Sequence, residues 1–150
     1  VLDKFIEDIN IAGSIFNKAN KVLCYHNHAL EFQKINNEII LERIYKNTNN
    51  KCIQGEPDIY WIQKGGHDPI SWCKKLKNRL PLIHLKDFIM VNEHESYYAE
   101  IGNGNLDIKN IIKEAELSGC KWYIVEQDEC QGDPFISIET SFNNLLEFVK

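Results

Sequence analysis

The sequence lacks the features that mark several large classes of protein. No apolar run approaches the roughly 20 residues of a membrane-spanning helix, and the N-terminus lacks the basic and then apolar layout of a signal peptide. The net charge of −5 is spread over segments of mixed sign, without the basic stripe that binds a nucleic-acid backbone. We therefore expect a cytoplasmic protein with neither a membrane nor a nucleic acid as its partner.

The sequence also lacks a CxxC pair among its five cysteines. An odd number of cysteines, several of them beside apolar runs, is typical of small buried side chains in a reducing compartment. What is present is 150 residues with 43% hydrophobic and 26% charged content, which predicts one globular domain over residues 1–150. The chain begins with Val1 inside a helical pattern, so we expect a fragment of a longer protein.

Helical and extended patterns alternate along the chain. Helices are predicted over residues 1–20, 38–50, 69–79, 106–119 and 138–150. Strands are predicted over residues 21–28, 52–61, 80–87 and 120–128. Turn and cap residues support these bounds, among them Asn20, Asn36-Asn37, the Asp68-Pro69 pair and Gly119. Residues 88–105 are predicted to be irregular.

This alternation favours a parallel sheet with helices packed outside it. The strands are apolar over most of their length, as expected for strands that are buried by such helices. Four strand-helix units fit two α/β folds, which are a small doubly wound sheet and one half of a (β/α)₈ TIM barrel. The positions of the polar residues distinguish the two.

Each predicted strand ends in two polar residues that are two positions apart. The pairs are His26 and His28, Glu56 and Asp58, His84 and Lys86, and Glu126 and Asp128. Residues two apart share one face of a strand, and an inward face would gather all four pairs at the C-terminal mouth of a barrel. Singly, the pairs have simpler interpretations, such as a solvated turn, a Lys86-Asp87 surface salt bridge or an exposed acidic loop. Their repetition at four equivalent places favours the half-barrel.

Five segments also carry a resemblance to a known family. They are YHNHALEF, GEPDIYWIQKGGHDP, RLPLIHLKD, IGNGNLDI and WYIVEQDE. Their order and spacing resemble the sugar phosphate isomerase/epimerase family, the xylose isomerase-like TIM barrel group. The chain is similar to the C-terminal half of a member, from the helix before strand five to the final helix. The resemblance covers nearly the whole chain.

The resemblance implies a divalent metal ion, often Mn²⁺, at the C-terminal mouth of the barrel. Such enzymes take ligands from strands five to eight, and the last three places correspond to Asp58, His84 and Glu126. At strand five the sequence offers imidazoles at His26 and His28, or the carboxylate of Glu31 from the following loop. We favour an imidazole slightly over Glu31. Oxygen and nitrogen ligands without a thiolate suit Mn²⁺, with Mg²⁺, Co²⁺ and Zn²⁺ as alternatives.

The implied function is a metal-dependent isomerase, epimerase or dehydratase. It would act on a sugar, sugar phosphate or cyclitol by removing a proton next to a carbonyl group. Glu126 is the candidate base, and His26 or His28 is the candidate acid on the other side. The candidate substrate-binding residues are Trp61, Lys86 and Asp128, and Lys86 is also a candidate for stabilising the negative charge of the reaction. Trp61 stands where many epimerases of the family have a histidine, which favours dehydration or one-sided isomerisation.

Two other functions fit the sequence less well. One is a noncatalytic half-barrel that binds a sugar or a partner, and the other is a metal-dependent endonuclease acting at abasic sites in DNA. The acidic balance of the chain disfavours the endonuclease. A half-barrel leaves two open strand edges, so we expect self-association or pairing with an N-terminal half-barrel.

Overall fold

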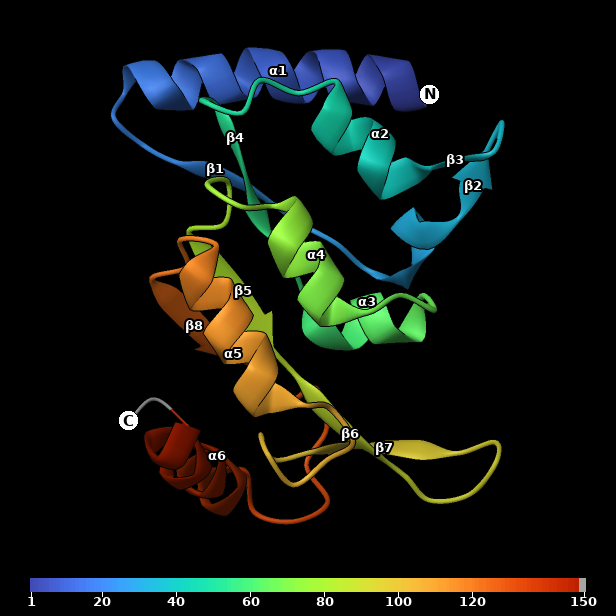
Figure 1. The fold of residues 1–150 in the computed structure, drawn as a ribbon, viewed down its shortest axis with the longest axis vertical. Coiled ribbons are helices and arrows are strands. Elements are labelled where there is room, and N and C mark those ends of the chain that lie inside the picture. Colours follow the sequence, from blue (N-terminus) through green and yellow to red (C-terminus); the bar gives the residue numbers. More distant parts are fainter. Residues whose placement is uncertain (149–150) are drawn as a thin grey trace.

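The computed structural model describes residues 1–148 and contains four parallel strands with helices packed against them (Figure 1). The strands are β1 (Leu23–His26), β4 (Ile53–Glu56), β5 (Leu82–Leu85) and β8 (Trp122–Val125). β1 pairs with β4, and β5 pairs with β8. A single parallel bridge between Asp58 and His84 joins the two pairs. The order across the molecule is therefore β1, β4, β5, β8, as expected for one half of a (β/α)₈ barrel.

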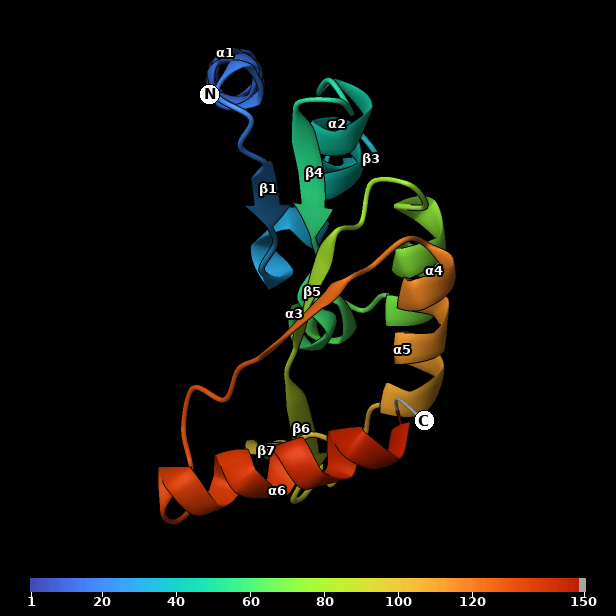
Figure 2. The ribbon, with the colours of Figure 1, turned by 90° about the vertical axis from the view of Figure 1, so that its left-hand side faces the viewer.

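Helices pack along one face of these strands. They are α1 (Leu2–Lys18), α2 (Ile40–Lys46), α3 (Ile59–Lys64), α4 (Pro69–Lys75), α5 (Ile108–Leu117) and α6 (Pro134–Phe148). Figure 2 shows α2, α4 and α5 on the same side of the strands, with α3 at the C-terminal end of the strands and α6 beside α5. The strand residues that face them, such as Ile53, Ile83 and Leu85, are at most 1% exposed. Ile83 and Leu85 form the main apolar core together with helical residues such as Trp72, on this outer side of the sheet.

The opposite, inner face of the strands is open. Alternate strand residues point to opposite faces, so Trp122 and Ile124 lie on the same face as Glu126. Trp122 is 69% exposed and Ile124 is 38% exposed. In a closed barrel these positions would lie inside the ring of strands. The half-barrel prediction is thus confirmed, with helices on the outer side and the inner-face residues Trp122 and Ile124 uncovered.

Several predicted helix ends are confirmed by their local geometry. Asn20 follows α1 with a φ of 54°, and Gly119 follows α5 with a φ of 102°. Both are conformations in which asparagine and glycine are favoured after a helix. Asp68 begins α4 by accepting hydrogen bonds from the backbone N–H groups of Ile70 and Ser71, with Pro69 at the first helical position.

The predicted strand over residues 52–61 is wrong in its second half. β4 ends at Glu56, and residues 59–64 form α3 instead. Pro57 has no N–H group to donate to a neighbouring strand, so it ends the strand pairing. The side chain of Asp58 then accepts hydrogen bonds from the N–H groups of Tyr60 and Trp61. Asp58 therefore starts a helix at the strand end.

Two hairpins were not predicted. The first joins β2 (Lys34–Ile35) to β3 (Glu38–Ile39), after the short helix η1 (Ala29–Phe32). Its turn is the predicted one, because Asn36 and Asn37 have φ angles of 52° and 65°. The second joins β6 (Asp87–Met90) to β7 (Ser96–Ala99), in the stretch predicted to be irregular. Exposed apolar residues such as Ile89 and Met90 obscure the alternation that normally identifies a strand.

The bounds of α2, α4 and α6 also differ from the prediction, and α4 ends at Lys75 rather than at residue 79. α2 spans Ile40–Lys46 rather than 38–50, because Glu38 and Ile39 belong to β3. α6 begins at Pro134, where the carboxylate of Asp133 accepts a hydrogen bond from the N–H of Phe135. The last two residues of the predicted final helix, 149–150, lie outside the described residues.

α6 is held by polar side chains and by two apolar ones, Leu145 and Phe148, which pack against the core. Ser141 Oγ accepts a hydrogen bond from the N–H of Ile101, and Ser137 Oγ bonds to the carboxylate of Glu100. Other large apolar side chains of α6 are exposed, with Phe135 82% exposed and Phe142 59% exposed. None of the described helices is long and apolar enough to cross a membrane.

Candidate active site

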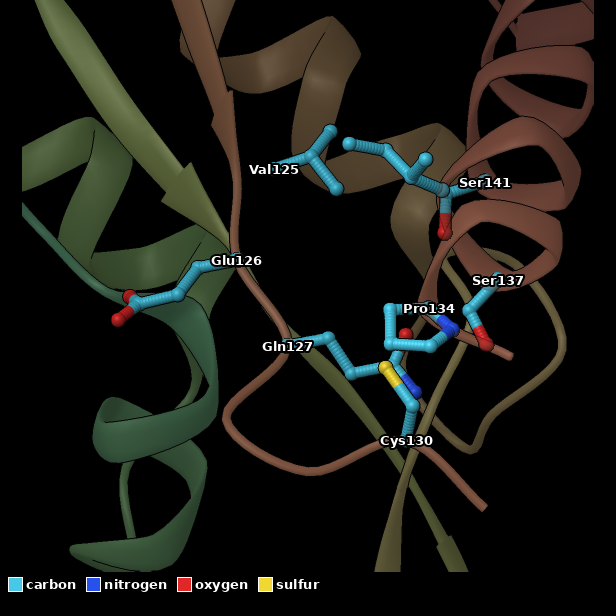
Figure 3. Close-up of a pocket in the computed structure, with 8 residues that line it drawn as sticks. Val125, Glu126, Gln127, Cys130, Pro134, Ser137 and Ser141 are labelled. Atoms are coloured by element: carbon cyan, nitrogen blue, oxygen red, sulfur yellow. The ribbon is translucent and has the colours of Figure 1, made fainter. Parts of the chain in front are cut away.

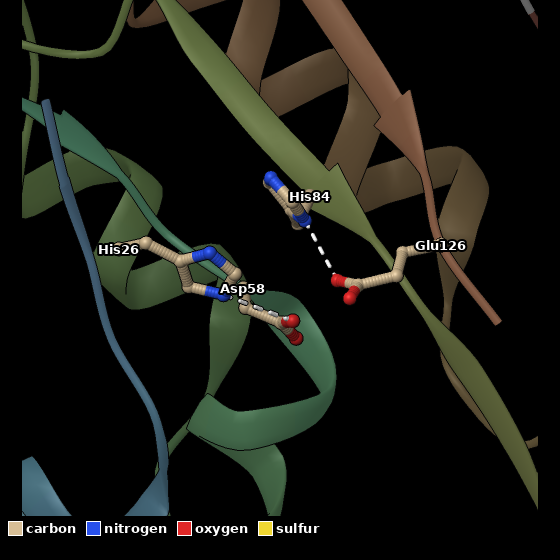
Figure 4. Close-up of side chains that lie close together, drawn as sticks. All are labelled: His26, Asp58, His84 and Glu126. Atoms are coloured by element: carbon tan, nitrogen blue, oxygen red, sulfur yellow. Dashed lines mark hydrogen bonds and ion pairs between the residues drawn. The ribbon is translucent and has the colours of Figure 1, made fainter. Parts of the chain in front are cut away.

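Four polar side chains converge at the C-terminal ends of the four parallel strands (Figure 4). They are His26, Asp58, His84 and Glu126, and we call them the ligand group. Each offers one nitrogen or oxygen atom, and these four atoms all lie within 4.8 Å of one another. His26 Nε2 lies 3.3 Å from Asp58 Oδ2, and His84 Nδ1 lies 2.8 Å from Glu126 Oε2. Each side chain comes from a different strand end.

Asp58 is the most firmly held member of the ligand group. Its side chain is 0% exposed, and its Oδ1 accepts hydrogen bonds from two N–H groups of α3. Its own N–H donates to Asn27 Oδ1, 3.2 Å away. The residue that begins the helix therefore also directs its second carboxylate oxygen, Oδ2, towards His26.

Exposure rises across the ligand group from Asp58 to Glu126. His84 is 14% exposed, His26 is 27% exposed and Glu126 is 36% exposed. The hydrogen bond that His26 donates to the carboxylate of Asp58 raises the pKa of His26 above its ordinary value, although partial burial acts in the opposite direction. Glu126 is thus the member most accessible from the open inner face.

The donor atoms of the ligand group fit a divalent transition metal. Two imidazole nitrogens and two carboxylate oxygens, without a thiolate, suit Mn²⁺, Co²⁺ or Zn²⁺. The His26–Asp58 and His84–Glu126 hydrogen bonds hold the side chains of the ligand group together in pairs. Four protein ligands leave room for substrate oxygens around an ion of higher coordination number.

Lys86 lies beside the ligand group and is almost completely buried. Its side chain is 2% exposed, and Nζ lies 3.0 Å from Asp128 Oδ1, 3.2 Å from Glu126 Oε2 and 3.5 Å from Asp58 Oδ2. Burial lowers the pKa of Lys86, but the hydrogen bond with Asp128 and the surrounding carboxylates outweigh it and raise the pKa overall. Lys86 therefore carries a buried positive charge held among three carboxylates.

The surface salt bridge considered for Lys86 and Asp87 does not form. The buried carboxylate of Asp87 instead accepts hydrogen bonds from the N–H groups of Phe88, Gly102, Gly104 and Leu106. Burial raises the pKa of Asp87, and these four hydrogen bonds act against that rise. Asp87 fixes the loop after β7 against the end of β5, next to Lys86.

Aromatic rings border the ligand group. The ring of His28 stacks on that of His26 with 5.1 Å between centroids and an interplanar angle of 3°, and it lies 5.3 Å from the ring of Trp61. Lys86 Nζ is 5.4 Å from the centre of Trp61 and 5.8 Å from that of Tyr98. His28 itself is exposed. The two candidate imidazoles thus occupy different places, with His26 inside the ligand group and His28 outside it.

Glu31 is not brought to the ligand group. Its Oε1 accepts a hydrogen bond from the hydroxyl of Tyr25 at 3.0 Å, and its Oε2 accepts one from the N–H of His28 at 2.9 Å. These bonds close the first turn of η1, the element that follows His28. Of the three strand-five candidates, the structure brings His26 to the group.

Two residues near the group were not among the predicted site residues. Glu56 Oε1 lies 2.8 Å from His84 Nε2. Tyr98 lies beside Lys86, and its hydrogen bond helps to lower the pKa of Asp128. Glu56 could have been found from its pairing with Asp58 at the strand end, whereas Tyr98 lies in the hairpin that was not predicted.

A separate cavity of about 330 Å³ lies between β8 and α6. Its lining includes Val125, Cys130 and Ser141 (Figure 3). The backbone of Glu126 borders this cavity, but Figure 3 shows its side chain pointing away from it. The cavity therefore lies behind the strand that carries Glu126 and not on the side of the ligand group.

The family of the chain follows from the sequence match and the fold together. Residues 1–148 match the family model for the xylose isomerase-like TIM barrel, and the chain belongs to this family. No curated protein matches the chain.

Solved structures of three other proteins have the same fold. A sugar phosphate isomerase/epimerase from Parabacteroides distasonis is 32% identical with a TM-score of 0.82, over 97% of this chain and 52% of that one. A 3-keto-D-glucoside 4-epimerase from E. coli is 12% identical with a TM-score of 0.69, over 97% and 53%. A probable 3-DHS dehydratase from Bacillus anthracis is 12% identical with a TM-score of 0.70, over 95% and 55%.

The chain spans about half the length of each of these three solved structures. The two structures at 12% identity indicate the fold alone. The family match establishes the xylose isomerase-like TIM barrel, and the structure at 32% identity is that of a protein named as a sugar phosphate isomerase/epimerase.

Proposed function

We propose that the protein containing this chain is a metal-dependent isomerase, epimerase or dehydratase that removes a proton next to a carbonyl group of a sugar or cyclitol. The observation that supports this most is the ligand group itself. Two imidazoles and two carboxylates from four strand ends lie within 4.8 Å at the C-terminal mouth, where barrel enzymes carry their chemistry.

The ligand group would hold the metal ion, for which we propose Mn²⁺. A divalent ion bound there supplies a Lewis acid that polarises a substrate carbonyl and makes the neighbouring C–H bond acidic. Glu126 is the proposed base, because it is the most exposed member of the group at 36%. It lies just after β8, at the C-terminal mouth of the barrel, from which a substrate would arrive.

His28 is the proposed acid on the other side of the substrate. It stacks on His26 but lies outside the ligand group, so its ring nitrogens remain available for a proton. An imidazole can give up a proton near neutral pH. One carboxylate base and one imidazole acid favour dehydration, hydration or one-sided isomerisation over epimerisation by two opposed carboxylates.

Lys86, Trp61 and Asp128 would bind the substrate beside this pair. The ammonium group of Lys86 can stabilise negative charge that develops on a substrate oxygen. Among residues 1–148, Lys86 is the one lysine or arginine that forms an ion pair with the ligand group, and it already lies near three carboxylates. This arrangement favours an uncharged sugar or cyclitol over a sugar phosphate, and the ring of Trp61 offers a flat apolar surface for it.

The test of this function is Glu126→Gln, which keeps the size and one oxygen ligand but removes the basic oxygen. We expect exchange of the substrate's α-proton with deuterated solvent to fall by about 10² to 10⁴ while substantial Mn²⁺ binding persists. Glu129→Gln is the matched control, since Glu129 is an exposed acid on the same loop. Exchange at the wild-type rate in a metal-loaded Glu126→Gln variant would show that Glu126 is a ligand and not the base.

The chain would act as one half of a closed barrel. The exposed inner-face residues Trp122 and Ile124, and the exposed apolar side chains of α6, support a second set of strands packed against them. We propose that this second set is either an N-terminal half-barrel or another copy of the chain. Parallel strands with open edges at β1 and β8 can close with either.

A further inference from the structure

Both ring nitrogens of His84 are engaged by carboxylates. Nδ1 lies 2.8 Å from Glu126 Oε2, and Nε2 lies 2.8 Å from Glu56 Oε1. Glu126 belongs to the ligand group, whereas Glu56 does not. Figure 4 shows the second nitrogen of His84 pointing away from Asp58 and Glu126. The two nitrogens therefore have different surroundings.

This difference indicates which nitrogen of His84 can bind a metal ion and which one carries the proton. An imidazole that binds a metal through one nitrogen keeps its proton on the other, and a carboxylate that accepts this proton fixes both the tautomer and the direction of the ring. Nδ1 faces the remaining members of the ligand group, so it is the nitrogen available to an ion. Nε2–H is then the donor to Glu56.

We infer that Glu56 is a positioning residue that holds His84 as the Nε2–H tautomer with Nδ1 directed at the metal. This inference rests on the proposed metal-dependent function. Glu56 does not touch the substrate or the ion, and it acts through His84 alone.

The placement of Glu56 suits this task. It is the last residue of β4, paired in parallel with His26 of β1, so its backbone is held by the sheet. Its side chain is 21% exposed and that of His84 is 14% exposed, so their hydrogen bond is largely shielded from water. Asp58, two residues further on, forms the bridge with His84. Glu56 therefore lies level with His26 and two residues before Asp58 along the chain.

Metal affinity tests the inference. We would titrate Mn²⁺ into wild type, Glu56→Ala, Glu56→Gln and the control Glu129→Gln, which removes the same charge from an exposed position of the same mouth. Glu56→Ala should weaken Mn²⁺ binding by about 10- to 100-fold, as is typical for the carboxylate behind a metal-binding histidine. Glu56→Gln should lose less, because its amide oxygen can still accept the Nε2–H bond. Glu129→Gln should stay within about twofold of wild type.

The tautomer of His84 is a second measurement, and it should not change if Glu56 only stabilises the fold. In the Zn²⁺-loaded protein, ¹⁵N NMR should detect an Nε2–H proton in slow exchange in wild type and in Glu56→Gln, and a loss of that protection in Glu56→Ala. If the Glu56→Ala variant does not fold, the Glu56→Gln variant tests the inference instead. Its ring signal should still report Nε2–H, with weaker metal binding than Glu129→Gln.

Two results would overturn the inference, and they differ. If wild type binds Mn²⁺ but both Glu56 variants bind it as tightly as Glu129→Gln, then Glu56 does not position His84 and the metal site stands. If wild type binds no Mn²⁺, the proposed metal-dependent function fails together with the inference.

Discussion

The two faces of the same four strands differ in almost every physical respect. On the outer face, Ile53, Ile83 and Leu85 are at most 1% exposed and pack beneath the helices. On the inner face, Trp122 is 69% exposed and the ligand group gathers four ionisable side chains. The outer face is packed by this chain's own helices, whereas nothing among residues 1–148 covers Trp122 and Ile124 on the inner one.

This contrast separates what makes the chain stable from what would make it active. Burial of apolar side chains under the helices stabilises the fold without help from another segment. The inner face combines buried charge, such as that of Lys86 at 2% exposure, with apolar residues left open to water. Substitutions on the outer face should therefore change the free energy of unfolding, whereas those on the inner face should change metal binding or association.

The largest expected effect is the loss of metal on the inner face. His84→Ala and Asp58→Ala each remove one of four ligands and should weaken Mn²⁺ binding by more than about 100-fold, beyond the loss expected for a residue that only supports a ligand. Asp58 also caps α3, so Asp68→Ala is its control, since Asp68 caps α4 with the same two kinds of backbone bond. Elemental analysis and Mn²⁺ titration measure both. Undiminished metal in the His84 and Asp58 variants would contradict the ligand group.

The second effect concerns stability and belongs to the outer face. Leu85→Ala leaves a cavity at a position that is 0% exposed and should lower the free energy of unfolding by about 3 kcal/mol. Ile124→Ala, at a position 38% exposed on the inner face, should cost less than about 1 kcal/mol. Urea denaturation of both variants measures the difference. Equal losses would mean that the inner face is covered in solution.

The smallest effect concerns association through the inner face. If the chain pairs with a second copy, Trp122→Lys should weaken self-association by about tenfold, or about 1.4 kcal/mol, because it places a charge where the second half-barrel packs. Leu117→Lys is the matched control, since Leu117 is 62% exposed at the end of α5 on the outer side. Size-exclusion chromatography with light scattering at several concentrations measures both. A monomeric wild type with protected amides would count against pairing between copies.

The sequence predicted most of the fold because its patterns are local. The apolar strands, the Asp68-Pro69 helix start and the Gly119 helix end each depend on a few neighbouring residues. The errors arose where tertiary contacts decide. The β6–β7 hairpin was not predicted because its stability comes partly from the buried Asp87, whose carboxylate accepts four backbone hydrogen bonds from β6 and from the loop beyond β7.

The candidate site divides in the same way. The sequence placed two polar residues at each strand end, and the resemblance to a family pointed to Asp58, His84 and Glu126. The sequence left the metal ligand from strand five open between His26, His28 and Glu31. Only the folded chain separates them, since Glu31 closes the turn of η1, His28 stacks outside and His26 bonds to Asp58.

The sequence by itself determined which residues share a face, because side chains alternate along a strand whatever it packs against. Only the tertiary structure decided which member of each pair reaches the centre. Glu56 pairs with His26 while Asp58 pairs with His84, so the strands are staggered by two residues between β1 and β5. This stagger follows from the tilt of strands in a barrel. It sets Asp58 in the ligand group and leaves Glu56 behind His84.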